Sequence, residues 1–286
     1  VPEVVPHGDR IDNLKWGLDV TNMYTYWMRK MTFIANSGGV PNEMEQLNAG
    51  YREERYAEDP NFTRFSSWNG GNPVGQFEYL SGTPELSKNF DDYDYTLENT
   101  MDAADQRHDV TTRVVISGTY TPNGFGSVAT RNGGGISFYY FKGNAIRVEA
   151  MRDMVNDRGQ IPQELRDAGL EQAIENVLAW NPNAFNSPTV SFSEGGIHFY
   201  YQGVCYYTVL IRHFSNNMVP VLMGYGRYGG GRNNVYQLSI NKIIGPGQPV
   251  INPPGTDPDD EDTSWISADV NIMRWYIRNQ NVEELL

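Results

Sequence analysis

The feature that most constrains the fold is a series of apolar, β-branched and aromatic runs between residues 187 and 246. These runs occupy residues 189–192, 197–214, 219–225 and 235–244, and clusters rich in Gly, Asn or Ser separate them. Val, Ile, Tyr and Phe fit a pleated, half-buried strand, whereas Gly and Asn favour the turns between strands. The second run is too long for one ordinary strand, which predicts a bend or turn at Gln202-Gly203. We therefore expect an antiparallel sheet here, covered by a second layer from the rest of the chain.

The composition fits a globular chain that is rich in β-structure and loops. Of the 286 residues 39% are hydrophobic, which argues against disorder, and 29 glycines and 16 prolines suit a protein with many turns. The formal net charge of −13 argues against a broad nucleic-acid-binding face, because such a face needs clustered Lys and Arg. It leaves a local basic patch open. No uninterrupted apolar run approaches about 18 residues, so no membrane-spanning segment is expected.

The chain has one cysteine, Cys205, inside a strand-like run. We expect a buried structural thiol; the alternative of a catalytic nucleophile would require a nearby histidine that the sequence cannot place. A reducing compartment is the natural expectation for such a chain. The first ten residues, VPEVVPHGDR, lack the basic and apolar regions of a signal peptide.

The N-terminal half alternates expected strands with polar stretches. Residues 1–10 carry two prolines and predict an extended arm. Asp12 or Asn13 is a candidate cap for a short helix that uses Leu14 and Leu18. Three further patterns follow: an acidic, exposed loop or short helix at residues 89–109, a strand at residues 111–120, and a hairpin that turns at residues 142–144.

Residues 157–180 carry the clearest helical signal of the chain. Pro162 suits the first turn of a helix, where a missing N–H costs nothing, and Gly169 is expected to interrupt or end that helix. Apolar residues then recur at helical spacing and form one stripe, which comprises Leu170, Ile174, Val177 and Leu178. We therefore expect a helical insert between two strand-rich blocks.

The C-terminal part predicts a linker followed by a helix. Residues 247–262 are rich in Pro and Asp, which favours an extended, solvated chain. Ser264 is a candidate N-cap for a helix over residues 263–286. The apolar face of that helix comprises Ile266, Val270, Met273 and Ile277, and Trp265 lies next to it. These five residues are the candidate interaction residues. Because an isolated helix of this length is marginal in water, we predict that this face docks on a neighbouring subunit or on the flank of its own molecule.

Together these elements predict an all-β fold, an antiparallel β-sandwich (jelly roll) with helical inserts and a C-terminal helical extension. The expected parts are an N-terminal arm (1–10), a sandwich core (11–246), a linker (247–262) and a C-terminal helix (263–286).

No motif indicates catalysis, a cofactor or a metal. The acidic runs at residues 91–94 and 257–262 lack the glycine and terminal glutamate of a calcium loop. The four histidines, His7, His108, His198 and His213, show no metal-ligand spacing. The glycines of residues 224–231 lack the lysine and the following helix of a phosphate loop. We therefore expect no enzyme, although the paired carboxylates of a glycosidase depend on fold rather than on sequence spacing.

The segment Tyr26-Trp27-Met28-Arg29-Lys30-Met31-Thr32-Phe33 is similar to the aromatic-x-Arg-Gly-Ser/Asp stretch of capsid proteins of picorna-like viruses, with Lys30 and Met31 in place of the small residues. Asp91-Asp92-Tyr93 is loosely similar to the Asp-Asp-Phe motif of insect members, and their maturation cleavage is not carried over. The layout of arm, strands, decorated loops and C-terminal extension also resembles this family. The resemblance implies an eight-stranded jelly roll that is excised from a polyprotein.

A protein of that family would be a structural subunit of an icosahedral virion. It would assemble in the host cytoplasm with homologous capsid subunits, in a hetero-oligomeric shell around an RNA genome, and a host receptor would be a further partner. Two other classes stay open. A β-sandwich carbohydrate-binding protein or adhesin would also be rich in Tyr, Trp, Asn and Asp, and a β-sandwich glycoside hydrolase is the third alternative.

Overall fold

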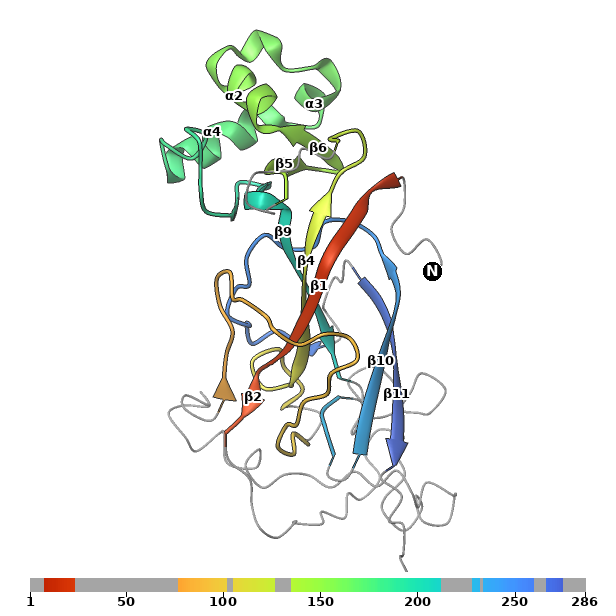
Figure 1. The fold of residues 1–286 in the computed structure, drawn as a ribbon. Coiled ribbons are helices and arrows are strands. Elements are labelled where there is room, and N and C mark those ends of the chain that lie inside the picture. Colours follow the sequence, from red (N-terminus) through yellow and green to blue (C-terminus); the bar gives the residue numbers. More distant parts are fainter. Residues whose placement is uncertain are drawn as a thin grey trace, which may run out of the picture.

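The computed structural model describes residues 8–23, 77–101, 105–126, 135–211, 228–231, 234–259 and 266–274. Antiparallel strands dominate this part of the chain, and its few helices gather at one end (Figure 1). The strands are β1 (Arg10–Asp19), β2 (Thr21–Asn22), β3 (Phe77–Glu78), β4 (Arg113–Thr121), β5 (Phe138–Phe141), β6 (Asn144–Arg147), β7 (Phe192–Glu194), β8 (Ile197–Tyr200), β9 (Val204–Leu210), β10 (Asn234–Ile243) and β11 (Ile266–Arg274). The helices are α2 (Val148–Asn156), α3 (Gln163–Asp167) and α4 (Leu170–Trp180), with short 3₁₀ turns at η5 (Arg158–Gln160) and η6 (Tyr201–Gly203).

The central sheet has the order β1-β4-β9, and both pairings are antiparallel. The strand predicted at residues 111–120 is confirmed as β4, but the helix predicted around Leu14 and Leu18 is wrong, because these residues belong to β1. A bulge between Asp12 and Lys15 explains the error. It adds a residue to the strand, so Ile11, Leu14 and Leu18 reach the same apolar cluster at a spacing that imitates a helix.

The first face of the central sheet packs against β10. The apolar cluster on this face contains Val114 and Ile116 of β4 and Tyr207 of β9, and Leu238 and Ile240 of β10 pack against it. Exposed and half-buried residues alternate along most of β10, as they do in a strand with one face toward a core and one toward solvent. The strand predicted at residues 235–244 is therefore confirmed, while the predicted run at residues 219–225 lies outside the described residues.

The opposite face and both edges of the central sheet are covered by loops. Val115, Tyr206 and Ile251 form a small cluster on the opposite face, with Leu80 and Leu86 against it. Each edge also carries an isolated bridge, since Lys88 pairs with Trp16 of β1, and Gln248 pairs with Tyr206 of β9. These bridges occupy main-chain groups that an open edge would otherwise expose.

The solvated linker predicted after residue 246 therefore needs correction. Its middle, around Asn252 and Pro253, is exposed as expected. Gln248 and Ile251, however, pair with the main chain of Tyr206 and Gly82, and Asp259 is buried. The segment is anchored by backbone hydrogen bonds, which its prolines do not prevent because the residues between them still carry N–H groups. The division of the chain at residue 246 remains a prediction.

The predicted helical insert is confirmed. Helix α4 begins after Gly169, which adopts a left-handed φ of 89°, and Pro162 precedes α3. The buried residues of α4 include Leu170, Ile174 and Val177, and they share a cluster with the four-stranded sheet β6-β5-β8-β7. The predicted hairpin at residues 142–144 is also confirmed as the turn between β5 and β6.

The long run at residues 197–214 is divided at the predicted place, but its two halves lie in different sheets. Strand β8 belongs to the four-stranded sheet and β9 to the central sheet. Between them Gly203 has a φ of 70°, and a Cβ at this position would lie 2.5 Å from the carbonyl oxygen of Tyr120. Only glycine fits this crossing without displacing the backbone. Next to this crossing, the rings of Phe138 on β5 and Tyr200 on β8, which are cross-strand partners in the four-stranded sheet, stack with centroids 4.7 Å apart.

A buried ion pair joins the end of β1 to the start of β4 in the central sheet. Arg113, at the start of β4, donates through Nε and Nη2 to Oδ2 of Asp19 at the end of β1, both at 2.7 Å. The other carboxylate oxygen, Oδ1, accepts from the backbone N–H groups of Val20 and Leu80 at 2.8 and 2.7 Å. One carboxylate therefore joins β1, β4 and the segment after β3.

We expect Arg113→Met to lower the free energy of unfolding by about 3–5 kcal/mol, because it leaves the Asp19 carboxylate buried without its cation. The matched control is Arg10→Met, which breaks the exposed pair between Arg10 and Asp12, whose side chains are 61% and 44% exposed. That change should cost less than about 1 kcal/mol. Urea denaturation of both variants checks the difference, and equal losses would contradict the role given to the buried pair.

Candidate assembly surfaces

The predicted C-terminal interaction residues lie partly on strand β11, where a helix was expected. Residues 266–274 pair antiparallel with β10, and Ile266, Val270 and Met273 stand opposite Ile243, Leu238 and Val235. The predicted helix is therefore wrong over this range, whereas Trp265 and Ile277 lie outside the described residues. The sequence contains the strand signal, because Ile266, Ala268, Val270 and Ile272 alternate with Ser267, Asp269 and Asn271. A spacing of four residues, as between Ile266 and Val270, fits both the helical period of 3.6 residues and the strand period of two residues.

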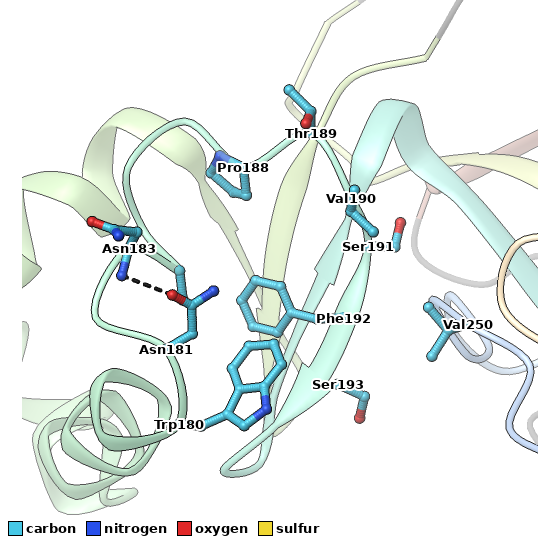
Figure 2. A pocket seen from close by; sticks show the side chains of 11 residues that line it. Trp180, Asn181, Asn183, Pro188, Thr189, Val190, Ser191, Phe192, Ser193 and Val250 are labelled. Atoms are coloured by element: carbon cyan, nitrogen blue, oxygen red, sulfur yellow. Dashed lines mark hydrogen bonds between the residues drawn. The ribbon is translucent and has the colours of Figure 1, made fainter.

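A groove opens where the helical insert meets the four-stranded sheet (Figure 2). It has a volume of about 460 Å³. Its walls come from the end of α4, the turn after it, the segment leading into β7, and one residue of the C-terminal segment. The lining residues are Trp180, Asn181, Asn183, Ala184, Pro188, Thr189, Val190, Ser191, Phe192, Ser193 and Val250.

Apolar groups dominate the groove, and two of them are exposed. The Trp180 side chain lies against the Phe192 ring with centroids 5.4 Å apart, yet Trp180 is 53% exposed, and Val190 is 69% exposed. Trp180 continues the buried stripe of α4, so the sequence alone would place it in the core. The groove was therefore missed, because only the tertiary structure shows that the stripe runs past the edge of the sheet.

The groove contains side-chain hydrogen-bond donors that have no partner among the described residues. They include the indole N–H of Trp180 and the side-chain amide nitrogen of Asn181. The amide oxygen of Asn181 accepts from the backbone N–H of Asn183 at 3.0 Å, which fixes the orientation of the amide. Its nitrogen then points toward Phe192, inside the groove (Figure 2).

A second exposed apolar surface is the aromatic loop of residues 89–97. Tyr93 and Tyr95 are 74% and 76% exposed, and their rings meet edge to face with centroids 5.7 Å apart. Phe90 and Leu97 are exposed in the same loop. The prediction of an exposed acidic loop is thus confirmed for this stretch. It is wrong for residues 98–101, 106 and 109, which are buried.

The base of the aromatic loop is fixed to β1. Asn89 accepts from the indole N–H of Trp16 through its backbone oxygen at 2.6 Å, and from Lys15 through its side-chain oxygen at 2.5 Å. Asp92 accepts from the backbone and side-chain nitrogens of Asn89 at 2.6 and 3.1 Å. The loop is therefore held in place while its tyrosine rings remain exposed.

The predicted structural thiol is confirmed. Cys205 is fully buried, and its Sγ donates to the carbonyl oxygen of Gly118 at 3.4 Å. Burial raises the pKa of the thiol to about 12, the opposite of what a nucleophile requires. A buried thiol of this kind is also protected from oxidation, so it does not by itself require a reducing compartment.

The described residues contain neither a metal cluster nor a membrane-spanning helix. Within them no three His, Cys, Asp or Glu side chains gather to hold a metal ion. His198 forms a 2.8 Å hydrogen bond with Ser193, and burial lowers the pKa of the imidazole. None of the helices described is both long enough and apolar enough to cross a bilayer.

One comparison with known proteins identifies a similar family. Residues 198–281 match the family model of the C-terminal part of fimbrillin, the major fimbrial subunit protein type IV. The match extends from β8 past β11 and covers less than a third of the chain. A search of the curated proteins finds no match.

This match overturns the resemblance to viral capsid proteins. The predicted virion, RNA genome, sister capsid subunits, host receptor and assembly in a host cytoplasm are therefore wrong. The alternative of a carbohydrate-binding protein or adhesin fits the match no better. The error arose because an arm, a β-rich core and a C-terminal extension describe many structural subunits, and the capsid-like segment at residues 26–33 lies outside the described residues.

We expect the protein to lose stability as the pH rises above about 9. Burial raises the pKa of Cys205 from its ordinary 9.0 to about 12, and it raises the pKa values of Tyr200 and Tyr207 above their ordinary 10.0. The unfolded chain therefore loses these protons first, and stability present below pH 9 is lost progressively above it. Urea denaturation between about pH 7 and pH 11 checks this, and the fall in stability with pH should be shallower in Cys205→Ala. An equally steep fall in that variant would contradict the role given to the thiol.

We expect the two faces of β10 to respond differently to charge. Leu238→Asp puts a carboxylate into the apolar cluster and should cost on the order of 2–3 kcal/mol. The neighbouring change Gln237→Asp, on the exposed face, should cost less than about 0.5 kcal/mol. Melting temperatures of the two variants measure the difference, and similar values would mean that β10 does not cover the central sheet.

Proposed function

We propose that this chain is a structural subunit of a bacterial surface fimbria and that it assembles with like subunits. The family match over residues 198–281 is the observation that carries this proposal. The matched segment includes β8 of the four-stranded sheet and β9 of the central sheet. It also includes both strands of the two-stranded sheet β10-β11.

The proposed architecture is a β-sandwich in which the two-stranded sheet β10-β11 forms the second layer over β1-β4-β9. The support is the shared apolar cluster between Tyr207 on β9, Ile116 on β4 and Leu238 on β10. Sheets packed in this way bury one face each against the other, and the outward-facing residues of β10 remain exposed for contacts with neighbours. The four-stranded sheet with its helices would then be an addition to one end of the sandwich (Figure 1).

A structural role also accounts for the chemistry of the described residues. The matched family is structural rather than enzymatic. We infer that this chain is likewise not an enzyme. The high pKa of the buried Cys205 thiol supports this inference, because a catalytic thiol needs a lowered pKa.

The C-terminal residues remain candidates for contacts between subunits. The sequence predicted this role for Trp265, Ile266, Val270, Met273 and Ile277. We propose that the two-stranded sheet β10-β11 and the residues next to β11 contact a neighbouring subunit. Strand β11 pairs only with β10 among the described strands, so its second edge has main-chain groups to offer to a neighbour.

Immunogold electron microscopy of the bacterium that encodes the chain tests the proposal. Antibodies raised against the folded chain should label filaments at the cell surface, and deletion of the gene should remove those filaments. Labelling restricted to the cytoplasm, or unlabelled filaments that persist in the deletion strain, would overturn the proposed function.

A further inference from the structure

We propose that the groove beside Trp180 binds the aromatic loop, residues 89–97, of a second copy of this chain. The inference rests on the proposed function, because it names the contact by which like subunits could join. The groove and the loop are the places where the described residues expose several large apolar side chains together. Exposed apolar patches of this kind mark contact surfaces.

The groove suits an aromatic side chain that carries a hydrogen-bond acceptor. Its volume of about 460 Å³ lies within the range of about 300–1,000 Å³ that is common for binding pockets. Trp180 and Phe192 supply the rings against which another ring can stack. The unpartnered N–H groups of Trp180 and Asn181 are donors, so an acidic or hydroxyl-bearing ligand would satisfy them.

The aromatic loop offers the matching groups. Tyr93 and Tyr95 present phenol rings that are three-quarters exposed, and such rings bind with little loss of side-chain entropy. Asp91 is exposed beside them. Asp94 accepts from the backbone N–H of Tyr95 through Oδ1 at 2.9 Å, and its Oδ2 pairs only loosely with Lys88 at 3.7 Å. The loop therefore combines stacking rings with acceptors.

Charge at the rim favours the same pairing. Arg152 of α2 is exposed and donates from Nη2 to the Ser187 side chain at 3.4 Å, next to Pro188 in the groove wall. It forms no ion pair with any residue in the described ranges. A guanidinium at the rim can therefore meet the carboxylates of an incoming loop. This local attraction matters because each copy has a net charge of −13, so copies repel one another elsewhere.

The two surfaces cannot meet within one molecule. Asn89 is fixed to the middle of β1, and the backbone oxygen of Glu98, directly after the loop, accepts from the Asn22 side chain of β2 at 2.8 Å, so both ends of the loop are held against strands. The groove lies at α4, at the helical end of the molecule in Figure 1. Two different surfaces that bind each other make a head-to-tail contact, and such contacts generate rings or open filaments instead of closed two-fold dimers.

The test uses full-length copies in which one surface is disabled. The groove variant is Trp180→Ala, and the loop variant carries both Tyr93→Ser and Tyr95→Ser. Sedimentation velocity should show that the wild type forms chains of copies and that each variant alone stays monomeric. An equal mixture of the two variants should form dimers and nothing longer, because each pair retains one intact contact. Circular dichroism checks that every variant is folded.

A charge exchange tests the pairing directly. A peptide with the sequence of residues 89–97 should bind the wild-type chain, and Trp180→Ala should weaken that binding by about tenfold or more. Arg152→Glu should weaken it several-fold, and replacing Asp91 and Asp94 of the peptide by Lys should restore binding to that variant. Val235→Ser, at an exposed apolar site on β10, is the control that should change nothing.

Three results would overturn the inference: a wild type that stays monomeric, a Trp180→Ala variant that associates normally, or a mixture that forms no dimers. If cells carry filaments that persist in the Trp180→Ala strain, the inference fails while the fimbrial function stands. If purified copies associate as expected but the cells carry no labelled filaments, the head-to-tail contact stands and the fimbrial function fails.

Discussion

The central sheet β1-β4-β9 has two faces and two edges that would contact solvent if nothing covered them. Described segments outside the helical insert pack against both faces and pair with both edges. Strand β10 packs against one face, and the segments around Leu80 and Ile251 pack against the other. Lys88 and Gln248 pair with the edges. The Asp19–Arg113 ion pair joins the end of β1 to the start of β4. Because both side chains are buried, either charge without its partner would lower the stability of the fold. Strand β4 lies at the centre of this arrangement, between β1 and β9.

The sequence predicted those elements whose signal is local. Helix α4, the turn between β5 and β6, and strand β10 each follow from a short periodic pattern with a Gly or Asn boundary, and all three are present. The signal that divides residues 197–214 into two strands at Gln202-Gly203 was also local, because Gly203 adopts a backbone conformation that other residues avoid.

Other features depended on distant residues and could not be read from the chain. The bulge in β1 made a strand look helical, and four-residue spacing in β11 fits either element until β10 lies beside it. That β8 and β9 join different sheets depends on which strands approach them from residues 113–147. The groove at Trp180 required the same information. The class of structural subunit was harder still, because strand patterns specify a β-rich core and not the assembly into which it is built.

The direction of the long strands has a mechanical consequence. Strands β1, β4, β9 and β10 run roughly along the length of the molecule (Figure 1), and their hydrogen bonds lie across that direction. A tension applied along the strands would act on the whole ladder of β4 in shear, so its bonds would resist together. The crossing at Gly203 lies between this ladder and the helical end, and it has a single 3₁₀ turn, η6, to bridge them. Under tension, the helical end should therefore yield before the central sheet does.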